Sequence, residues 1–172
     1  MTPDPESVGK RWTEYSEAHE AAVAAGAPPA TLANTLVVGG SAIIVQDGAV
    51  LLERRRDNGK WGIPGGGMQI GEWFEDCVVR EIREETGFEV RVDRIVGVYS
   101  NPGHVMVYAD GERRQEFTIC CACTIIGGEL KVSAESLDVA FHALDALDGL
   151  EVHESGRQRI VDYLADGPPV LR

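Results

Sequence analysis

A run of glycines followed by an acidic helix constrains this chain more than any other feature of its sequence. Gly65 to Gly67 form a loop whose backbone can approach a ligand closely, because glycine has no side chain. A helical pattern then extends from about Trp73 to Thr86, and Gly87 stands where a left-handed residue commonly ends a helix. The sequence therefore predicts a glycine loop that leads directly into a helix.

Three glutamates share one face of this predicted helix. Glu81, Glu84 and Glu85 occupy positions i, i+3 and i+4, so we expect their carboxylates to project toward a common point. Like charges at this spacing repel each other, and a bound divalent cation would remove the repulsion. Oxygen ligands favour a hard cation such as Mg²⁺, which often bridges substrate phosphates. The alternative is a solvated acidic face with Arg80 and Arg83 as ion-pair partners.

The segment from Gly66 to Phe88 resembles the complete Nudix box. In that pattern a glycine, five residues, a glutamate and seven residues precede Arg-Glu-aliphatic-x-Glu-Glu-x-Gly-apolar, and every fixed position is met. Trp61, Pro64 and Gly65, just before the box, are also similar to the family. The resemblance implies an α/β (α+β) Nudix fold, in which a mixed β-sheet lies between helices. It also implies a Nudix hydrolase, which cuts the diphosphate linkage of a nucleoside diphosphate derivative with water.

The resemblance further implies the roles of several residues. The implied metal ligands are the main-chain carbonyl of Gly65 and the carboxylates of Glu81, Glu84 and Glu85. Arg80 would orient a catalytic glutamate through charge-assisted hydrogen bonds, and Glu72 would hold the loop to the helix. Mg²⁺, or Mn²⁺ as a substitute, would lower the pKa of a bound water and so supply the nucleophile. Either Glu84 or Glu85 is the favoured general base.

Residues outside the box are candidates to complete the site. Glu135 and Glu116 are more distant candidates for the general base, and relatives often place a loop acid where Glu135 stands. Glu135 could equally be a solvated loop charge. Arg54, Arg55 and Arg56 follow a predicted strand, and Arg54 and Arg55, with Glu116, are the predicted substrate contacts. We expect at least one of the three arginines to be only a solvated charge at a sheet edge.

The remaining patterns predict one domain, residues 31–172, that follows a helical arm. The arm is an amphipathic helix from about Glu6 to Ala25 with a linker to Ala30, and it could either dock on a second subunit of a homodimer or cover the chain's own core. Leu36–Gln46 and Ala49–Arg54 are predicted to form a hairpin around Asp47-Gly48. The other predicted elements are strands at Glu89–Tyr99 and Val139–His142, a hairpin of His104–Tyr108 with Arg114–Ile126, a helical turn at Leu144–Leu147, and a closing helix at His153–Ala165.

Composition narrows the classes of partner and the compartment. Acidic residues outnumber basic residues by 28 to 16, and the net charge of −12 disfavours unaided binding to nucleic acid or anionic lipid. No apolar run approaches a membrane span, and the first residues lack the basic start of an export signal, so we expect a cytoplasmic protein without a membrane partner. The cysteines match no zinc pattern and are expected to be buried free thiols, namely Cys77, Cys120, Cys121 and Cys123.

The expected substrate is a small nucleotide. Some Nudix enzymes that cleave ADP-ribose have a proline about fifteen residues beyond the box, and Pro102 lies fifteen residues after Gly87. We therefore favour a nucleoside diphosphate sugar such as ADP-ribose. The alternative is a nucleoside triphosphate, including oxidised ones, cut to the monophosphate and pyrophosphate. A non-catalytic nucleotide sensor and a diphosphate isomerase are further alternatives, but the intact box and the lack of a matching cysteine and glutamate pair disfavour them.

Overall fold

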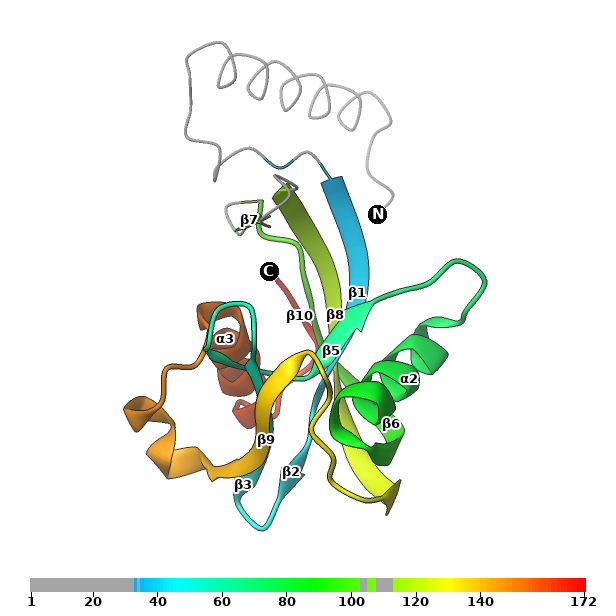
Figure 1. Cartoon of the computed structure of the whole chain (residues 1–172). Coiled ribbons are helices and arrows are strands. Elements are labelled where there is room, and N and C mark those ends of the chain that lie inside the picture. The colour runs from blue at the N-terminus through cyan, green and yellow to red at the C-terminus, as the bar shows by residue number, and fades with distance from the viewer. Residues whose placement is uncertain (1–32, 34, 103–104, 108–112) are drawn as a thin grey trace, which may run out of the picture. The chain divides into compact units, whose positions relative to one another are not determined.

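The computed structural model describes residue 33 and residues 35–102, 105–107 and 113–172 (Figure 1). One compact unit contains Val37–Ser100 and Phe117–Arg172, and a second includes Asn101–Glu116. The predicted helical arm, residues 1–30, lies outside the described residues, as does the turn predicted at Asp110-Gly111. The boundary between an arm and a domain at residue 30 stays a prediction.

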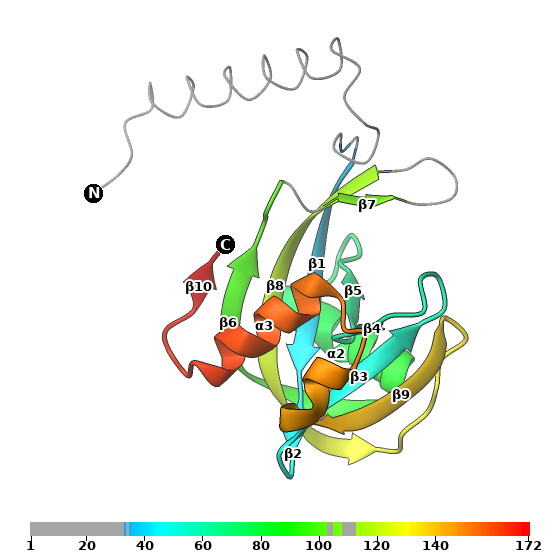
Figure 2. The same cartoon turned by 90° about the vertical axis from the view of Figure 1, so that its left-hand side faces the viewer.

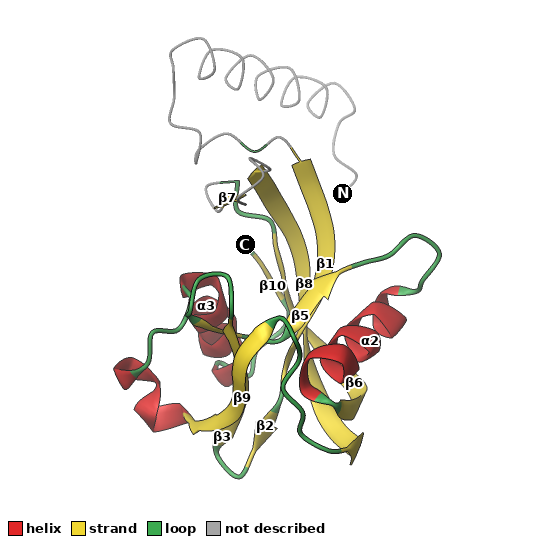
Figure 3. Ribbon diagram, in the orientation of Figure 1, coloured by secondary structure: helices red, strands yellow, loops and turns green. Residues whose placement is uncertain are grey.

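Two β-sheets form the framework, with the strands drawn in yellow in Figure 3. The first sheet has the spatial order β10 (Val170–Leu171), β6 (Phe88–Tyr99), β8 (Arg113–Gly128), β1 (Thr35–Ile43) and β5 (Gly65–Gly67), with β7 (Val105–Val107) paired to β8. The second sheet has the order β2 (Val45–Gln46), β3 (Ala49–Arg55) and β4 (Trp61–Gly62), with β9 (Ser136–Ala143) also paired to β3. Since β10 runs parallel to β6 while β6 and β8 are antiparallel, the first sheet is mixed, as predicted.

The helices cover opposite sides of the sheets, as Figure 2 shows for α3 (Glu154–Leu164) in front and α2 (Phe74–Thr86) behind. Val78 and Ile82 of α2 belong to one apolar core, which also contains Ala42 of β1. Ile160 of α3 belongs to a second core, which contains the next residue of β1, Ile43. Neighbouring strand residues point to opposite faces, so both faces of the strand are buried. The predicted fold class, a mixed sheet between helices, is confirmed.

The predicted hairpin at the start of the domain is only partly right. The turn is present, since Asp47 and Gly48 have positive φ angles of 51° and 75°, but only Val45–Gln46 pair with Ala49–Val50. The longer strand β1 pairs instead with β5 in the other sheet. The chain changes sheets at Ile43 and Ile44, which are each 1% exposed and belong to different cores. A regular hairpin would not bury these two residues in separate cores.

The four cysteines are buried and free, as predicted. Burial raises the pKa of Cys77 to about 11 and the pKa of Cys121 and Cys123 to about 12. A neutral thiol is a poor nucleophile, so these side chains serve packing. In the described part of the chain, the helices are too short or too polar to cross a membrane.

Helix α2 ends where the sequence predicts. Gly87 adopts the left-handed conformation, with φ of 76°, and its N–H donates to the carbonyl of Arg83. A β-carbon at this position would lie 2.3 Å from the carbonyl oxygen of Glu129. Glycine is therefore required here both for its backbone conformation and for lack of space.

We expect Gly87→Ala to lower the free energy of unfolding by more than the roughly 1–2 kcal/mol that a left-handed alanine costs. Gly59→Ala is the matched control, because Gly59 has φ of 71° but open space around the position of a β-carbon. The control should show the conformational cost alone in urea unfolding experiments. Equal losses in the two variants would contradict the steric role assigned to the Glu129 carbonyl.

Candidate active site

The glycine strand β5 lies directly against the acidic face of α2. Gly65 and Gly66 pair with Ser41 and Gly40 of β1, which fixes the strand in the sheet. A β-carbon on Gly66 would lie 2.5 Å from the carboxyl carbon of Glu81. The sequence predicted that Gly65 to Gly67 form a loop whose backbone a ligand can approach closely. In the structure these residues form a short strand, and the group that approaches their backbone is the Glu81 carboxylate.

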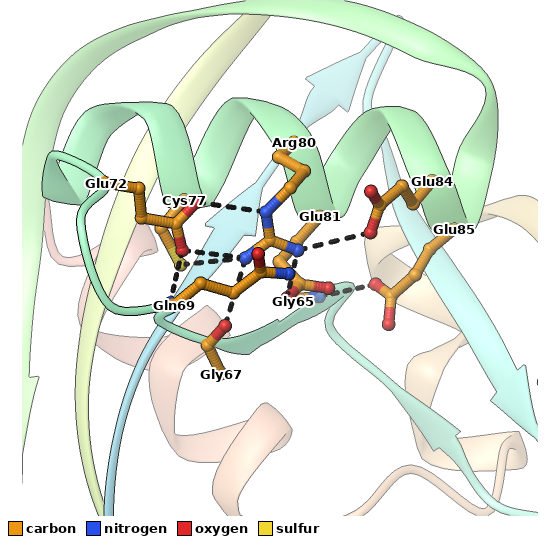
Figure 4. A network of polar contacts seen from close by, with 9 residues as sticks. All are labelled: Gly65, Gly67, Gln69, Glu72, Cys77, Arg80, Glu81, Glu84 and Glu85. Atoms are coloured by element: carbon orange, nitrogen blue, oxygen red, sulfur yellow. Dashed lines mark hydrogen bonds and ion pairs between the residues drawn. The ribbon is translucent and has the colours of Figure 1, made fainter.

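Arg80 connects the acidic residues of α2 with the loop before it (Figure 4). One guanidinium nitrogen, Nη1, donates to Glu81 Oε1 at 2.7 Å and to Glu84 Oε2 at 3.1 Å. The other two nitrogens donate to both oxygens of Glu72, at 3.0 and 2.8 Å, and Nη2 also donates to the Gly67 carbonyl. Arg80 thus pairs with three carboxylates, and these partners, Glu72 first, raise the pKa of its guanidinium further.

Glu72 joins the loop to the helix. Its Oε1 accepts the backbone N–H of Gln69, and both of its oxygens hold Arg80. The hydrogen bonds from Arg80 and then from Gln69 lower the pKa of Glu72 to about 2. Glu72 therefore stays ionised at physiological pH values. It connects Gln69 of the loop with Arg80 of the helix, which is the contact that the resemblance implied.

Glu85 points away from Arg80 and into the protein. Its Oε2 accepts the N–H of Gly65 at 2.7 Å. Burial, followed by the charge of Glu53, raises the pKa of Glu85 to about 9, and the Gly65 hydrogen bond and the charge of Arg55 act in the opposite direction. Ionisation of Glu85 is therefore costly in the chain as it stands.

Glu53 is a residue that sequence reasoning missed. It lies on β3, is 4% exposed, and accepts a hydrogen bond from Ser136 Oγ at 2.7 Å. Strand periodicity could have found it, because Glu53 shares a face with Leu51, which packs against α2 in the same core. A buried glutamate on that face must lie near the helix. A strand with one buried face is recognised by alternating buried and exposed residues. Leu51, Leu52 and Glu53 are all buried, so this alternation is missing here.

The predicted substrate arginines lie at the end of β3. Arg55 is paired with Asp57, with 2.6 Å between Nη2 and Oδ2, and its charge reaches Glu85. Arg54 is exposed, and its Nε donates to the carbonyl of Gly59 at 3.0 Å. Arg55 therefore lowers the pKa of Glu85 slightly while it pairs with Asp57, and Arg54 holds the turn that follows β3. Their roles as substrate contacts stay predictions.

The two candidate glutamates outside α2 lie in different parts of the chain. Glu135 is exposed in the loop before β9, and its carbonyl accepts the N–H of Arg56 at 3.0 Å. Glu116 is half-buried in β8 and belongs to the unit that includes Asn101–Glu116. Its role as a substrate contact or base stays a prediction.

The sequence predicted that the carboxylates of Glu81, Glu84 and Glu85 project toward a common point, but in the structure they have different hydrogen-bond partners. Among the described residues, no three His, Cys, Asp or Glu side chains form a group that could hold a metal ion as they stand. The reason is that Glu81 and Glu84 are hydrogen-bonded to Arg80, while Glu85 accepts from Gly65. The donor set nevertheless suits a hard divalent cation, because it consists of carboxylate oxygens, and a cation would offset the desolvation and like charge that oppose ionisation of Glu85.

Comparison with known proteins decides the family. The family described as NUDIX domain matches residues 35–164, which is most of the chain and includes α2, the second sheet and the first sheet except β10. The chain belongs to the Nudix family. It is accordingly a Nudix hydrolase, and the sequence-based recognition of the box is confirmed.

Individual Nudix relatives agree with this assignment. A protein of Methanocaldococcus jannaschii named ADP-ribose pyrophosphatase is 37% identical over 131 residues, which cover 71% of this chain and 69% of the relative. The nucleoside triphosphatase NudI of Escherichia coli K12 is 34% identical over 107 residues, covering 58% of this chain and 76% of the relative. The crystal structure of an ADP-ribose pyrophosphatase from Streptococcus suis superposes with a TM-score of 0.62 at 22% identity, covering 79% of this chain and 98% of that one. This likeness shows that the fold is that of a Nudix hydrolase.

The raised pKa of Glu85 predicts how stability depends on pH when no metal is added. The folded chain holds this proton more tightly than the unfolded chain, so the stabilisation is complete below pH 4.5 and is lost as pH rises toward about 9. The loss can reach about 1.4 kcal/mol per pH unit. Urea unfolding in EDTA between pH 5 and 8.5 should show this slope for the wild type and a flatter one for Glu85→Gln. The exposed Glu89→Gln control should keep the wild-type slope, and an unchanged slope in Glu85→Gln would refute the assignment.

Proposed function

We propose that this Nudix hydrolase cuts the diphosphate linkage of a nucleoside diphosphate sugar with Mg²⁺ as its cofactor, and that ADP-ribose is the leading candidate substrate. The observation that carries the proposal is the placement of Glu81 and Glu85 beside the glycine strand, where Glu85 accepts from Gly65, with Glu84 joined to Glu81 through Arg80. Hydrolases of this family depend on a divalent cation, and the carboxylate donors of α2 suit Mg²⁺, with Mn²⁺ as a possible substitute.

The residues have separate roles in this proposal. The main-chain carbonyl of Gly65 and the carboxylates of Glu81, Glu84 and Glu85 would hold the cation. Bound there, the cation supplies charge neutralisation for the diphosphate and activation of a water. Arg80 holds Glu81 and Glu84 in position through its hydrogen bonds. The bonds of Arg80 to Glu72 involve none of the proposed cation ligands, so they would join the helix to the loop whether or not the cation is bound.

Proton transfer is assigned to the glutamates. The side chain of Glu84 is 54% exposed, while Glu85 is half-buried and burial raises its pKa to about 9. Either can accept the proton of the attacking water, and Glu135, or less directly Glu116, is the candidate outside α2. Arg55 is the best placed cation for the substrate phosphates, because its charge already reaches Glu85. Arg54 is a weaker candidate, since its Nε is engaged by Gly59.

Two observations favour ADP-ribose. The Methanocaldococcus jannaschii relative, at 37% identity, has the name of an ADP-ribose pyrophosphatase. Pro102 also stands at the distance from the box that the sequence analysis associated with such enzymes. A nucleoside triphosphate is the second candidate, because the relative named nucleoside triphosphatase is 34% identical over a shorter stretch. A homodimer in the cytoplasm, with no membrane or stable nucleic-acid partner, completes the proposal and rests on the sequence.

A substrate panel with Mg²⁺ and with Mn²⁺ tests the proposal. We expect ADP-ribose to yield AMP and a sugar phosphate without orthophosphate, because water attacks within the diphosphate. A nucleoside triphosphate would instead yield the monophosphate and pyrophosphate. Chromatography of the products distinguishes the two reactions. Faster turnover of triphosphates than of ADP-ribose would replace the leading substrate with its rival.

The same assay tests the residues. Glu84→Gln and Glu85→Gln should each lower turnover by about 100-fold or more at saturating Mg²⁺, since both substitutions remove a charge that holds the cation or accepts the proton. Glu75→Gln is the control, because Glu75 lies exposed in the first turn of the same helix. Wild-type turnover in both test variants would remove α2 from the mechanism.

A further inference from the structure

The loop that carries Glu135 is fastened to the end of β3 by one residue, Arg56. The backbone N–H of Arg56 donates to the carbonyl of Glu135 at 3.0 Å. Its Nε donates to the carbonyl of Ala134 at 3.0 Å, and its Nη2 donates to the carbonyl of Ser136 at 2.8 Å. Three consecutive carbonyls, centred on Glu135, are therefore bound to the same arginine. The planar guanidinium can reach two of them at once, which the single ammonium group of a lysine cannot do in the same geometry.

Serine hydroxyls fix the same loop from the other side. Ser136 Oγ donates to the buried Glu53 at 2.7 Å, and Ser133 Oγ lies 2.7 Å from Ser136 Oγ. Ser133 Oγ also accepts the backbone N–H of Glu135 at 3.2 Å. Both backbone polar groups of Glu135 are thus held, while its side chain is exposed. These hydrogen bonds fix the backbone of Glu135 and leave its carboxylate exposed.

The end of β3 connects this loop to the acidic cluster of α2. Glu53 accepts from Ser136 of the loop and shares a strand face with Leu51, which packs in one apolar core with Val78 and Ile82 of α2. Arg55, two residues further along β3, pairs with Ser136 in the sheet register. The Glu135 loop and the proposed metal-binding face of α2 therefore meet at the same few residues of β3.

We propose that Arg56 is a positioning residue, which holds Glu135 where its carboxylate acts on the diphosphate bound beside α2. The inference rests on the proposed function and adds a residue whose hydrogen bonds go to the loop of Glu135 and not to the glutamates of α2. Arg56 acts through the backbone of Ala134, Glu135 and Ser136. The competing role is purely structural, in which Arg56 stabilises the loop without effect on Glu135.

A double-mutant cycle separates the two roles. Arg56→Lys, Glu135→Gln and the double variant are assayed for kcat and KM with ADP-ribose at saturating Mg²⁺. We expect Glu135→Gln to lower kcat by about 100-fold, as loss of a general base does. Arg56→Lys should lower kcat by about tenfold in the wild-type background, with KM nearly unchanged, and should have no further effect in the Glu135→Gln background.

Arg91→Lys is the matched control. Arg91 is an exposed arginine on β6 with a short-range pair to Asp93, so its substitution should leave kcat unchanged in both backgrounds. Thermal unfolding of all variants reports any loss of stability. An equal loss of kcat from Arg56→Lys in both backgrounds would show a structural role and overturn the inference.

The outcomes also separate this inference from the proposed function. Wild-type kcat in Glu135→Gln, together with inactive Glu84→Gln and Glu85→Gln variants, would overturn the positioning role and leave the diphosphate hydrolysis intact. Absence of turnover by the wild type, on every diphosphate compound of the panel, would overturn the proposed function itself.

Discussion

The charge-assisted hydrogen bonds of Arg80 are the interaction on which the rest of the site depends. Glu81, Glu84 and Glu72 repel each other, and a single guanidinium lies between them at 2.7 to 3.1 Å from their oxygens. Because Glu72 stands in the loop and the other two acids on α2, these bonds fix the helix to the loop as well as offsetting the repulsion. The paired side chains of Arg80, Glu72 and Glu81 are only 14% to 16% exposed, so water screens these bonds less than it screens a surface pair.

A second constraint comes from two acids on facing elements, Glu53 of β3 and Glu85 of α2. Glu53 is buried and accepts from Ser136, while Glu85 accepts the N–H of Gly65. Burial, followed by the charge of Glu53, raises the pKa of Glu85, so a cation held there would offset the cost of ionising it. The chain's net charge of −12 repels a free diphosphate, which agrees with the proposal that a cation mediates binding.

The parts of the site set by local backbone geometry could be predicted from sequence. Helical spacing placed Glu81, Glu84 and Glu85 on one helix, although not their hydrogen-bond partners, and Gly87 ends α2 through its left-handed conformation. Long-range arrangement was not predictable in the same way. The change of sheet at Ile43 and Ile44 depends on two separate cores, and the burial of Glu53 depends on β9 and α2, which are far from it in sequence. The role of Arg56 was likewise hidden, because its carbonyl partners lie about eighty residues later.

The most direct test of the account is a titration of the wild type and the Glu81→Gln and Glu85→Gln variants with Mn²⁺, followed by electron paramagnetic resonance of the free ion. The account predicts that the wild type binds Mn²⁺ and that each substitution weakens binding by at least about tenfold, equivalent to about 1.4 kcal/mol. Mg²⁺ should displace the bound Mn²⁺. Wild-type affinity for Mn²⁺ in both variants would contradict the assignment of α2 as the metal-binding face.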